Sequence, residues 1–235
     1  YCDFASYEGL EAYYDDYVDA LIREMTLWAE AYPDSTTAPV RSVYFGGGTP
    51  TQLSEAHWEK LFGALRSLYH IDDAAEITTE ANPGEITRPY LQYLRQLGIN
   101  RISFGIQTFD EPSLAILRRG HTAEEAVQAV TDAAAVGFPH ISGDLIYALP
   151  GQTIDQLKAN IQRLEALPVD HISIYGLQLE EGTNLEKQVR TGVISLPDED
   201  EAELMYDTML EQLALRGFER YEISNFARNG AYSRH

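Results

Sequence analysis

Residues 40–51 read VRSVYFGGGTPT, an apolar, β-branched run that ends in three consecutive glycines and stiffens at once with Thr49-Pro50. Glycine loses more backbone entropy on folding than other residues, so three in a row are costly. They indicate that something must come close to the backbone here that a side chain would obstruct, such as a ligand. Proline restricts itself and its predecessor, which argues against a loose loop. No Lys-Ser or Lys-Thr follows, and the spacing G-x-G-x-x-G is absent. The stretch therefore predicts a strand whose carboxyl end presents its backbone to a ligand.

Four more apolar, β-branched segments follow along the chain, at 75–81, 101–107, 140–149 and 171–178. Helical patterns separate them, and strand alternating with helix predicts serial βαβ units and a parallel sheet. We expect an α/β fold of the partial, open (β/α)6 barrel type rather than a closed eight-stranded barrel. A sixth parallel strand is expected before Cys2, and residues 218–227 are expected to add a further strand.

The helical patterns have recognisable ends and faces. Thr122 with Glu125, and Thr153 with Gln156, have the spacing of capping boxes. Apolar residues at helical spacing predict two further buried faces, one near each end of the chain: Tyr13, Tyr17, Leu21 and Met25, and Met205, Met209 and Leu213. The sequence thus predicts helices between the strands and at both ends.

Each predicted strand has an unusual residue at or near its carboxyl end. Besides the glycines 46–48, these residues are Glu80, Gln107, Asp144 and Gln178. Taken singly, each is explained equally well as a helix cap or a solvent contact. The carboxyl ends of parallel strands lie at one edge of a sheet, where ligands bind. Five such residues in register therefore indicate one polar site.

Composition excludes several classes of protein. The chain has 235 residues, 44% of them hydrophobic, which suffices for one large domain with a buried core. The formal net charge of −20 is unfavourable for nucleic acid, so we expect no nucleic-acid partner. No apolar run is long enough to predict a transmembrane segment. The single cysteine, Cys2, excludes an internal disulfide and is typical of a reducing compartment, so we predict a cytoplasmic location.

Six motifs, in matching order over nearly the whole chain, resemble the radical S-adenosylmethionine (radical SAM) family. They are YCDF (1–4), YFGGGTPT (44–51), EANPGEI (80–86), RISFGIQTF (101–109), DLIYALPGQT (144–153), and YEISNFA (221–227) followed by SRH (233–235). Within the family, the chain is most similar to the oxygen-independent coproporphyrinogen III oxidases and to their relatives, the HemW-type heme chaperones. The family motif C-x-x-x-C-x-x-C is represented by its last cysteine, Cys2. The resemblance therefore implies two further cluster ligands upstream of residue 1.

The resemblance implies a [4Fe-4S] cluster and SAM as cofactors. Three thiolates leave one iron open to the amino and carboxylate groups of the methionine portion of SAM. The implied SAM-contacting residues are Gly47, Gly48 and Thr49 at the methionine portion, Tyr1 near adenine, Glu80 at the amino group or in a second site, Gln107, Arg119 and Asp144 at further positions, and Gln178 at a nucleoside position. Arg118 is the alternative to Arg119. The resemblance implies no catalytic residue beyond this site.

Proteins of this family transfer an electron from the cluster to SAM, which yields methionine and a 5′-deoxyadenosyl radical. The oxidase uses that radical to decarboxylate coproporphyrinogen III, whereas the chaperone binds heme and passes it to acceptor proteins. The implied partners are therefore heme or a porphyrinogen, an electron donor for the cluster, and a heme-acceptor protein. Whether the chain is an enzyme stays open at this point.

Two features favour the chaperone. Phe4 stands where the oxidase usually carries a cysteine. The ending SRH resembles the approach to the chaperone's H-N-x-x-Y-W motif, which makes His235 a candidate heme ligand. A second histidine, His121, is expected at the surface before the Thr122 cap.

The lysines and the polar strand ends also bear on two other classes of protein. A metabolic β/α-barrel enzyme without a cluster needs a metal set or a strand-end lysine, but Lys60, Lys158 and Lys187 all fall in helical segments or their flanks. A pure scaffold needs neither the glycine turn nor the aligned polar residues. We predict that residues 1–182 form the partial barrel and that 183–235 lead into a C-terminal domain covering its mouth beyond His235.

Overall fold

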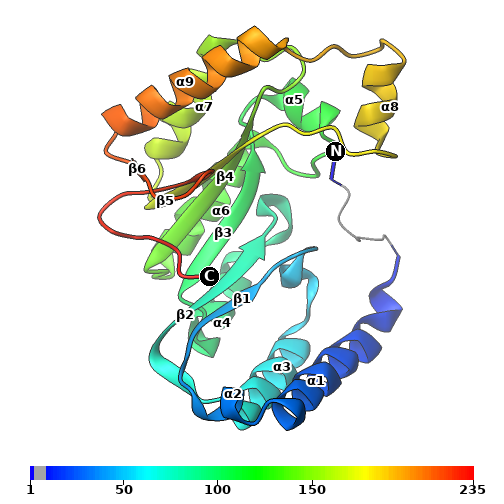
Figure 1. Ribbon diagram of the computed structural model, residues 1–235, viewed down its shortest axis with the longest axis vertical. Coiled ribbons are helices and arrows are strands. Elements are labelled where there is room, and N and C mark those ends of the chain that lie inside the picture. The colour runs from blue at the N-terminus through cyan, green and yellow to red at the C-terminus, as the bar shows by residue number, and fades with distance from the viewer. Residues whose placement is uncertain (3–8) are drawn as a thin grey trace.

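The computed structural model describes residues 1–2 and 9–235, so the prediction at Phe4 lies outside the described residues. Figure 1 shows one curved sheet with helices along its outer side, and the carboxyl end of the chain lying at the open side. The seven strands of the described residues have the order β1-β2-β3-β4-β5-β7-β6. Their bounds are β1 Val40–Phe45, β2 Ile71–Ala81, β3 Arg101–Gln107, β4 His140–Tyr147, β5 His171–Gly176, β6 Glu219–Arg220 and β7 Asn225–Ala227.

Strands β1 to β5 are parallel and pair in sequence order, which confirms the predicted α/β sheet. The segment expected to add one strand, 218–227, instead forms two short strands, β6 and β7. Strand β7 runs antiparallel to β5, and β6 runs antiparallel to β7. Within the described residues, β1 and β6 are the edges of the sheet, so the barrel is partial and open. The strand expected before Cys2 and the division at residue 182 stay predictions.

Helices α3, α4, α6, α7 and α9 pack on the outer face of the sheet, with α1 and α3 at one end of the molecule and α7 and α9 at the other, whereas α8 lies apart from this layer (Figure 1). The described residues contain nine α-helices. Their bounds are α1 Tyr14–Ala31, α2 Asp34–Thr37, α3 Glu55–Leu68, α4 Arg88–Leu97, α5 Glu111–Ile116, α6 Ala123–Ala135, α7 Ile154–Glu165, α8 Asn184–Arg190 and α9 Glu199–Leu215. Both predicted capping boxes are present, at Thr122 before α6 and at Thr153 before α7. A further one opens α3, where the Ser54 hydroxyl accepts from the backbone N–H of His57.

The core lies between the sheet and the helices, while the opposite face of the sheet is polar. On β3, Ile102 and Phe104 are fully buried in the core, and Arg101 and Ser103 line the cavity on the other side. This alternation is the two-residue period of a strand. The inner face of this half barrel is therefore available for a site rather than for apolar packing.

The predicted apolar face of the N-terminal helix is partly wrong. Tyr13 and Tyr17 are exposed, whereas Val18 and Ala29 are buried. Helix α1 packs against α3, so its buried stripe follows the side that meets that helix. The late helix α9 buries Met205, Met209 and Leu213 as predicted.

Candidate functional site

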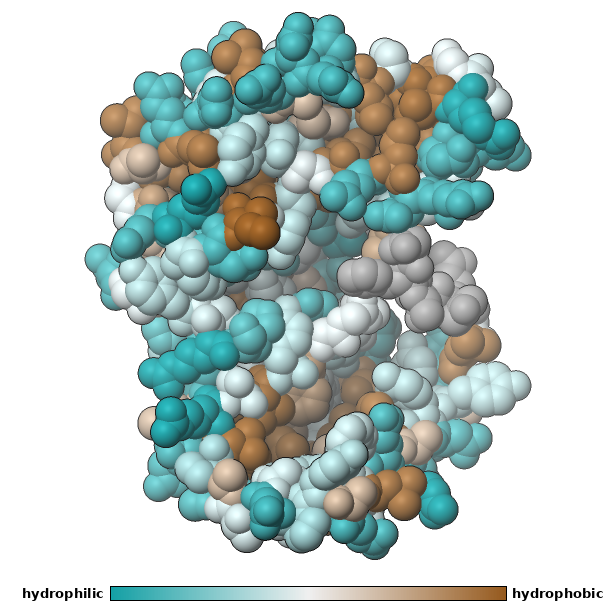
Figure 2. Space-filling model, in the orientation of Figure 1, coloured by the Kyte–Doolittle hydropathy of each residue, from teal (hydrophilic) through white to brown (hydrophobic). Residues whose placement is uncertain are grey.

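A cavity of about 880 Å³ lies on the inner face of the sheet, at the carboxyl ends of the parallel strands. Figure 2 shows the hollow between the two halves of the molecule. Every residue predicted for the site lines this cavity, namely Tyr1, Cys2, Gly47, Gly48, Thr49, Glu80, Gln107, Arg119, Asp144, Gln178 and His235. The fold thus brings together residues from all five parallel strands or the loops that follow them, as the polar strand ends predict.

The glycine turn after β1 contains three glycines with different surroundings. Gly47 has φ +103°, a left-handed conformation that favours glycine. A Cβ at Gly48 would meet no atom of residues 1–2 and 9–235 within 4 Å, so among these residues it faces open space. A Cβ at Gly46 would lie 2.4 Å from the Tyr44 ring and 2.9 Å from the Glu80 carboxylate. Gly46 therefore makes room for protein side chains, whereas Gly48 borders the cavity.

Glu80, near the end of β2, is held by two donors. The Tyr44 hydroxyl donates to Oε1 at 2.5 Å, and the backbone N–H of Gly47 donates to Oε2 at 3.2 Å. Burial, the hydrogen bond to Glu80 and the charge of that carboxylate raise the pKa of Tyr44, so its phenol remains a proton donor. A carboxylate has about four lone-pair sites, so Glu80 can still accept from a cation in the cavity.

Arg119 lies on the cavity wall and is fixed by two acceptors. Its Nη2 donates to Asn82 Oδ1 at 2.6 Å and to the carbonyl oxygen of Gly105 at 2.8 Å, and its Nη1 lies 3.5 Å from the Tyr1 hydroxyl. Its Nε is buried without a hydrogen-bond partner in the described part of the chain. The neighbouring Arg118 is exposed. Both arginines line the cavity, and Arg119 is the one whose guanidinium is fixed by Asn82 and Gly105.

Gln107 ends β3 with a left-handed backbone, φ +68°, next to a register shift between Gly105 and Gln107. A Cβ at Gly105 would come within 2.9 Å of the Gln107 amide nitrogen and 3.2 Å of Arg119. Strained backbone of this kind is concentrated at functional sites. The structure therefore uses a glycine and an unfavourable conformation to place the Gln107 amide beside Arg119.

Asp144 lies on the inner face of β4 and accepts a hydrogen bond from Ser103 Oγ at 2.9 Å. Its removal from solvent raises the pKa of this carboxyl to about 7, although the hydroxyls of Ser103 and Ser173 act in the opposite direction. The nearby charge of Glu80 raises the pKa further. Asp144 therefore changes its charge close to neutral pH.

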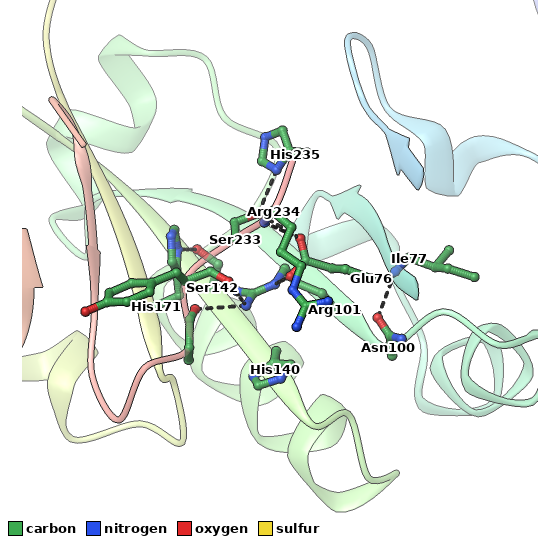
Figure 3. Close-up of polar contacts among 12 residues, drawn as sticks. Glu76, Ile77, Asn100, Arg101, His140, Ser142, His171, Ser233, Arg234 and His235 are labelled. Atoms are coloured by element: carbon green, nitrogen blue, oxygen red, sulfur yellow. Dashed lines mark hydrogen bonds and ion pairs between the residues drawn. The ribbon is translucent and has the colours of Figure 1, made fainter. Parts of the chain in front are cut away.

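The carboxyl-terminal tail, residues 231–235, is fastened to the far end of the same inner face (Figure 3). Arg101 Nε pairs with Glu76 Oε2 at 3.0 Å, and both side chains are buried. Glu76 Oε1 accepts from the Ser233 hydroxyl at 3.0 Å and from the backbone N–H of Arg234 at 2.8 Å, while Arg101 Nη2 donates to the carbonyl oxygen of Ala231 at 2.8 Å. The ion pair thus joins β2, β3 and the tail.

A second set of bonds positions the tail from β5. The Tyr221 hydroxyl lies 2.7 Å from His171 Nε2 and accepts from the backbone N–H of Ser233 at 3.2 Å. Burial and the charge of Arg101 lower the pKa of His171 to about 3, so this imidazole is neutral. Its Nδ1 lies 2.7 Å from the Ser142 hydroxyl. The tail is therefore held on one side by the buried Glu76–Arg101 pair and on the other by the half-buried Tyr221, which contacts the buried His171.

This arrangement places the exposed side chain of His235 on the wall of the cavity. Its ring stacks on Tyr44, with centroids 3.9 Å apart and planes 25° apart. Its Nδ1 lies 2.6 Å from Ser233 Oγ. Within the described residues, Nε2 of His235 is therefore the ring nitrogen left for another ligand.

The remaining predicted residues have less defined surroundings. Cys2 is exposed on the cavity wall. Gln178 follows β5 at the exposed cavity rim. The surface position expected for His121 is wrong: this residue is buried, with Nε2 lying 3.2 Å from the carbonyl oxygen of Ile106. Because the loop folds back onto β3, burial lowers the pKa of His121. Among residues 1–2 and 9–235, no three His, Cys, Asp or Glu side chains are grouped to hold a metal ion.

Sequence reasoning missed three parts of the site. Asn82 links Thr49, Glu85 and Arg119, and its place just after a strand end was the available signal. Tyr44 lies within the glycine motif but resembles any apolar strand residue. The Glu76–Arg101 pair joins segments 25 residues apart, and no local pattern marks it.

Comparison with known proteins finds the same family that the sequence motifs resemble. The family model of the radical SAM superfamily matches residues 1–164. The heme chaperones HemW of Lactococcus lactis and Bacillus subtilis are each 35% identical to the chain and match all of it. The chain spans 60% and 62% of their lengths, respectively. A zebrafish (Danio rerio) mitochondrial radical S-adenosyl methionine domain-containing protein 1 is 34% identical, and the chain spans 52% of its length.

Among solved structures, the Escherichia coli coproporphyrinogen III oxidase HemN, a radical SAM enzyme, superposes with a TM-score of 0.85. It is 27% identical and matches 97% of this chain, which corresponds to 52% of HemN. The archaeal Elp3 of Methanocaldococcus infernus shares the fold with a TM-score of 0.63 at 18% identity. The half barrel, the gathering of the predicted residues in one cavity and the match over residues 1–164 lead to one conclusion. The chain belongs to the radical SAM superfamily.

Proposed function

We propose that this chain is the radical SAM part of a protein that binds heme and transfers it to acceptor proteins, with His235 as the heme ligand. The observation that carries the proposal is the position of His235, which lies in the same cavity as the residues that resemble a SAM site. The likeness to HemW heme chaperones over the full chain supports the choice of ligand.

Three features of the cavity fit SAM. Open space faces Gly48, where backbone can approach the methionine portion. Glu80 is oriented by two donors and can accept from an ammonium group. Arg119 carries a buried nitrogen without a partner in the described residues, beside the Gln107 amide. These residues, with Thr49, Asp144 and Tyr1, would hold and orient SAM, while Gln178 would contact its nucleoside from the rim.

The cluster would be held by Cys2 together with two cysteines upstream of this chain, which has one cysteine. When bound, the cluster and SAM supply one-electron chemistry to the site. An electron donor is therefore a proposed partner. A Cys2→Ser protein is expected to retain little iron, as measured by iron content after anaerobic reconstitution of the intact protein. Iron retention equal to that of the unaltered protein would contradict Cys2 as a ligand.

His235 suits heme because a neutral imidazole nitrogen is a common axial ligand of heme iron. Ser233 contacts Nδ1 and so fixes which nitrogen faces the cavity. None of the helices in the described part of the chain could cross a membrane. The cytoplasmic location and the heme-acceptor protein are parts of the proposal.

The alternative function is oxidative decarboxylation of coproporphyrinogen III, and the TM-score of 0.85 with HemN is the observation that favours it. That substrate carries four carboxylates and needs several cations around it. The arginines lining the cavity are Arg101, Arg118 and Arg119. Arg101 is neutralised by Glu76, and Arg119 is assigned to SAM in this proposal, which leaves Arg118 among these three for the four carboxylates. The charge of the cavity therefore favours heme binding over this alternative.

The test is a titration of the intact, cluster-loaded protein with heme, in which heme binding is measured by the Soret absorption. The variant His235→Ala lacks the imidazole, so it should bind heme about tenfold or more weakly than the unaltered protein. His140→Ala is the matched control, because His140 pairs with Asp170 and does not line the cavity. Equal heme affinity in both variants would contradict His235 as the ligand. Enzymatic turnover of coproporphyrinogen III with SAM and reductant would establish the alternative instead.

A further inference from the structure

A series of hydrogen bonds leads from a buried ion pair to the imidazole of His235 (Figure 3). Arg101 Nε donates to Glu76 Oε2 at 3.0 Å, and the Ser233 hydroxyl donates to Glu76 Oε1, also at 3.0 Å. The same hydroxyl oxygen lies 2.6 Å from Nδ1 of His235. A single hydroxyl group therefore connects the imidazole to a buried carboxylate.

The carboxylate of Glu76 decides the direction of these bonds. It accepts from three donors, because the backbone N–H of Arg234 also donates to Oε1, at 2.8 Å. Although burial acts in the opposite direction, these donors and the charge of Arg101 hold the pKa of Glu76 below its ordinary value, so the side chain is ionised at neutral pH. An ionised carboxylate only accepts hydrogen bonds. The one hydrogen of the Ser233 hydroxyl is therefore used on Glu76.

The direction of the Ser233 bond fixes the tautomer of His235. With its hydrogen on Glu76, the Ser233 oxygen can only accept from the imidazole. The 2.6 Å contact then places the hydrogen of the neutral imidazole on Nδ1 and the lone pair on Nε2. The Tyr44 ring stacks on one face of the imidazole, with planes 25° apart, and so does not occupy this lone pair, which lies in the plane of the ring.

We propose that Glu76 and Ser233 are positioning residues that hold neutral His235 in the tautomer with a bare Nε2, and so prepare it to bind heme iron rather than a carboxylate. This inference rests on the proposed function. A histidine that ligates a metal usually donates its other ring N–H to an oxygen atom, which fixes the tautomer and the orientation of the ring. The opposite tautomer would present an N–H to the cavity, which suits the carboxylates of a metal-free porphyrinogen instead.

The first measurement determines the tautomer of His235 in the intact, cluster-loaded and heme-free protein. Histidine labelled at its ring nitrogens is followed by NMR at mildly alkaline pH, and the His235 signals are those that His235→Ala lacks. In the unaltered protein, Nδ1 should carry the hydrogen. In Ser233→Ala, which lacks the acceptor, the population with the hydrogen on Nε2 should increase. A ring that carries its hydrogen mainly on Nε2 in the unaltered protein would overturn the proposal.

The second measurement is the heme affinity of the intact, cluster-loaded protein. Ser233→Ala should bind heme about tenfold more weakly than the unaltered protein, because Nδ1 loses the acceptor that fixes the tautomer. The tail keeps its bonds from Arg234 to Glu76 and from Arg101 to Ala231 in this variant. Ser233→Thr retains a hydroxyl and should bind heme to within about twofold of the unaltered protein.

Tyr232→Phe is the matched control for fastening of the tail. The Tyr232 hydroxyl donates to Glu219 Oε2 at 2.5 Å and so joins the tail to β6, but it makes no bond to Glu76, Ser233 or His235. This variant should bind heme like the unaltered protein. A loss as large as that in Ser233→Ala would show that fastening of the tail accounts for the effect, and would overturn the proposal.

The variants also separate this inference from the proposed function. If His235→Ala weakens heme binding but Ser233→Ala does not, the positioning role is wrong and the proposed function stands. If His235→Ala binds heme as tightly as the unaltered protein, the proposed heme ligand fails and the positioning role fails with it, whichever tautomer is found.

Discussion

At the scale of single residues, two glycines and two carboxylates of this cavity differ in role because their surroundings differ. Gly46 makes room for Tyr44 and Glu80, whereas Gly48 faces open space. Glu80 is held by two donors, whereas Asp144 is desolvated and titrates near neutral pH. Residue type alone does not distinguish the members of either pair.

A methyl group at Gly46 should therefore be costly to the fold. In Gly46→Ala, the Tyr44 ring and the Glu80 carboxylate must both shift, and overpacking of this kind lowers the free energy of unfolding by about 1–3 kcal/mol. Gly48→Val should unfold like the unaltered protein but lose SAM binding, because its side chain enters the cavity. Urea denaturation and equilibrium dialysis measure the two effects. Equal stability of the two variants would contradict this assignment.

The pKa of Asp144 predicts how SAM binding depends on pH. Since burial raises this pKa to about 7, the carboxyl is largely protonated at pH 6 and ionised at pH 8. The ionised form accepts hydrogen bonds from ligand hydroxyls, so SAM affinity should rise as the pH increases through 7. Asp144→Asn cannot ionise and should show a flatter profile over this range. A flat profile in the unaltered protein would count against the prediction.

At the scale of elements, three strands begin with the same pattern: Arg101-Ile-Ser, His140-Ile-Ser and His171-Ile-Ser. The isoleucines are buried in the core, and the serines line the cavity. Ser103 lies opposite Ser142 in the register of β3 and β4. Polar residues therefore run along the inner face, and not only at the strand ends that the sequence singled out.

The helices on the outer face depend on their caps. Thr153 accepts from the backbone N–H of Gln156 at the start of α7, and Thr153→Ala should lower the free energy of unfolding by about 1 kcal/mol. Thr131→Ala is a control within α6, where the hydroxyl donates to the carbonyl of Val127 instead of capping a helix end. Chemical denaturation of both variants measures the difference. A loss in Thr131→Ala as large as that in Thr153→Ala would contradict a specific capping effect.

At the scale of the whole molecule, the buried Glu76–Arg101 pair connects the sheet to the carboxyl-terminal tail. Although burial opposes it, the backbone N–H of Arg234 and the charge of Arg101 hold the pKa of Glu76 below its ordinary value. The stability that ionised Glu76 contributes is therefore present at neutral pH, which lies above the ordinary pKa of a glutamate side chain. It is lost as the pH falls through the lowered pKa.

Removing one partner of this pair should be far more costly than breaking an exposed pair. Arg101→Met leaves Glu76 buried and uncompensated, and should lower the free energy of unfolding by about 3–5 kcal/mol. Arg163→Met breaks the surface pair with Glu124 and should cost about 1 kcal/mol or less. Urea denaturation at neutral pH compares the two variants. Similar losses in both would indicate that the tail is held by other contacts.

The sequence by itself determined the order of strands and helices, the helix caps, the glycine turn and the gathering of Glu80, Gln107 and Asp144 at one end of the sheet. These features follow from local periodicity and from the rule that parallel strands share a carboxyl edge. Only the tertiary structure decided the antiparallel pairing of β6 and β7, the burial of His121, the hydrogen bond from Ser233 to Glu76 and the stacking of His235 on Tyr44. Such contacts join positions as far apart as residues 44 and 235, because side chains pair where curvature and packing bring them together, and no local pattern encodes that distance.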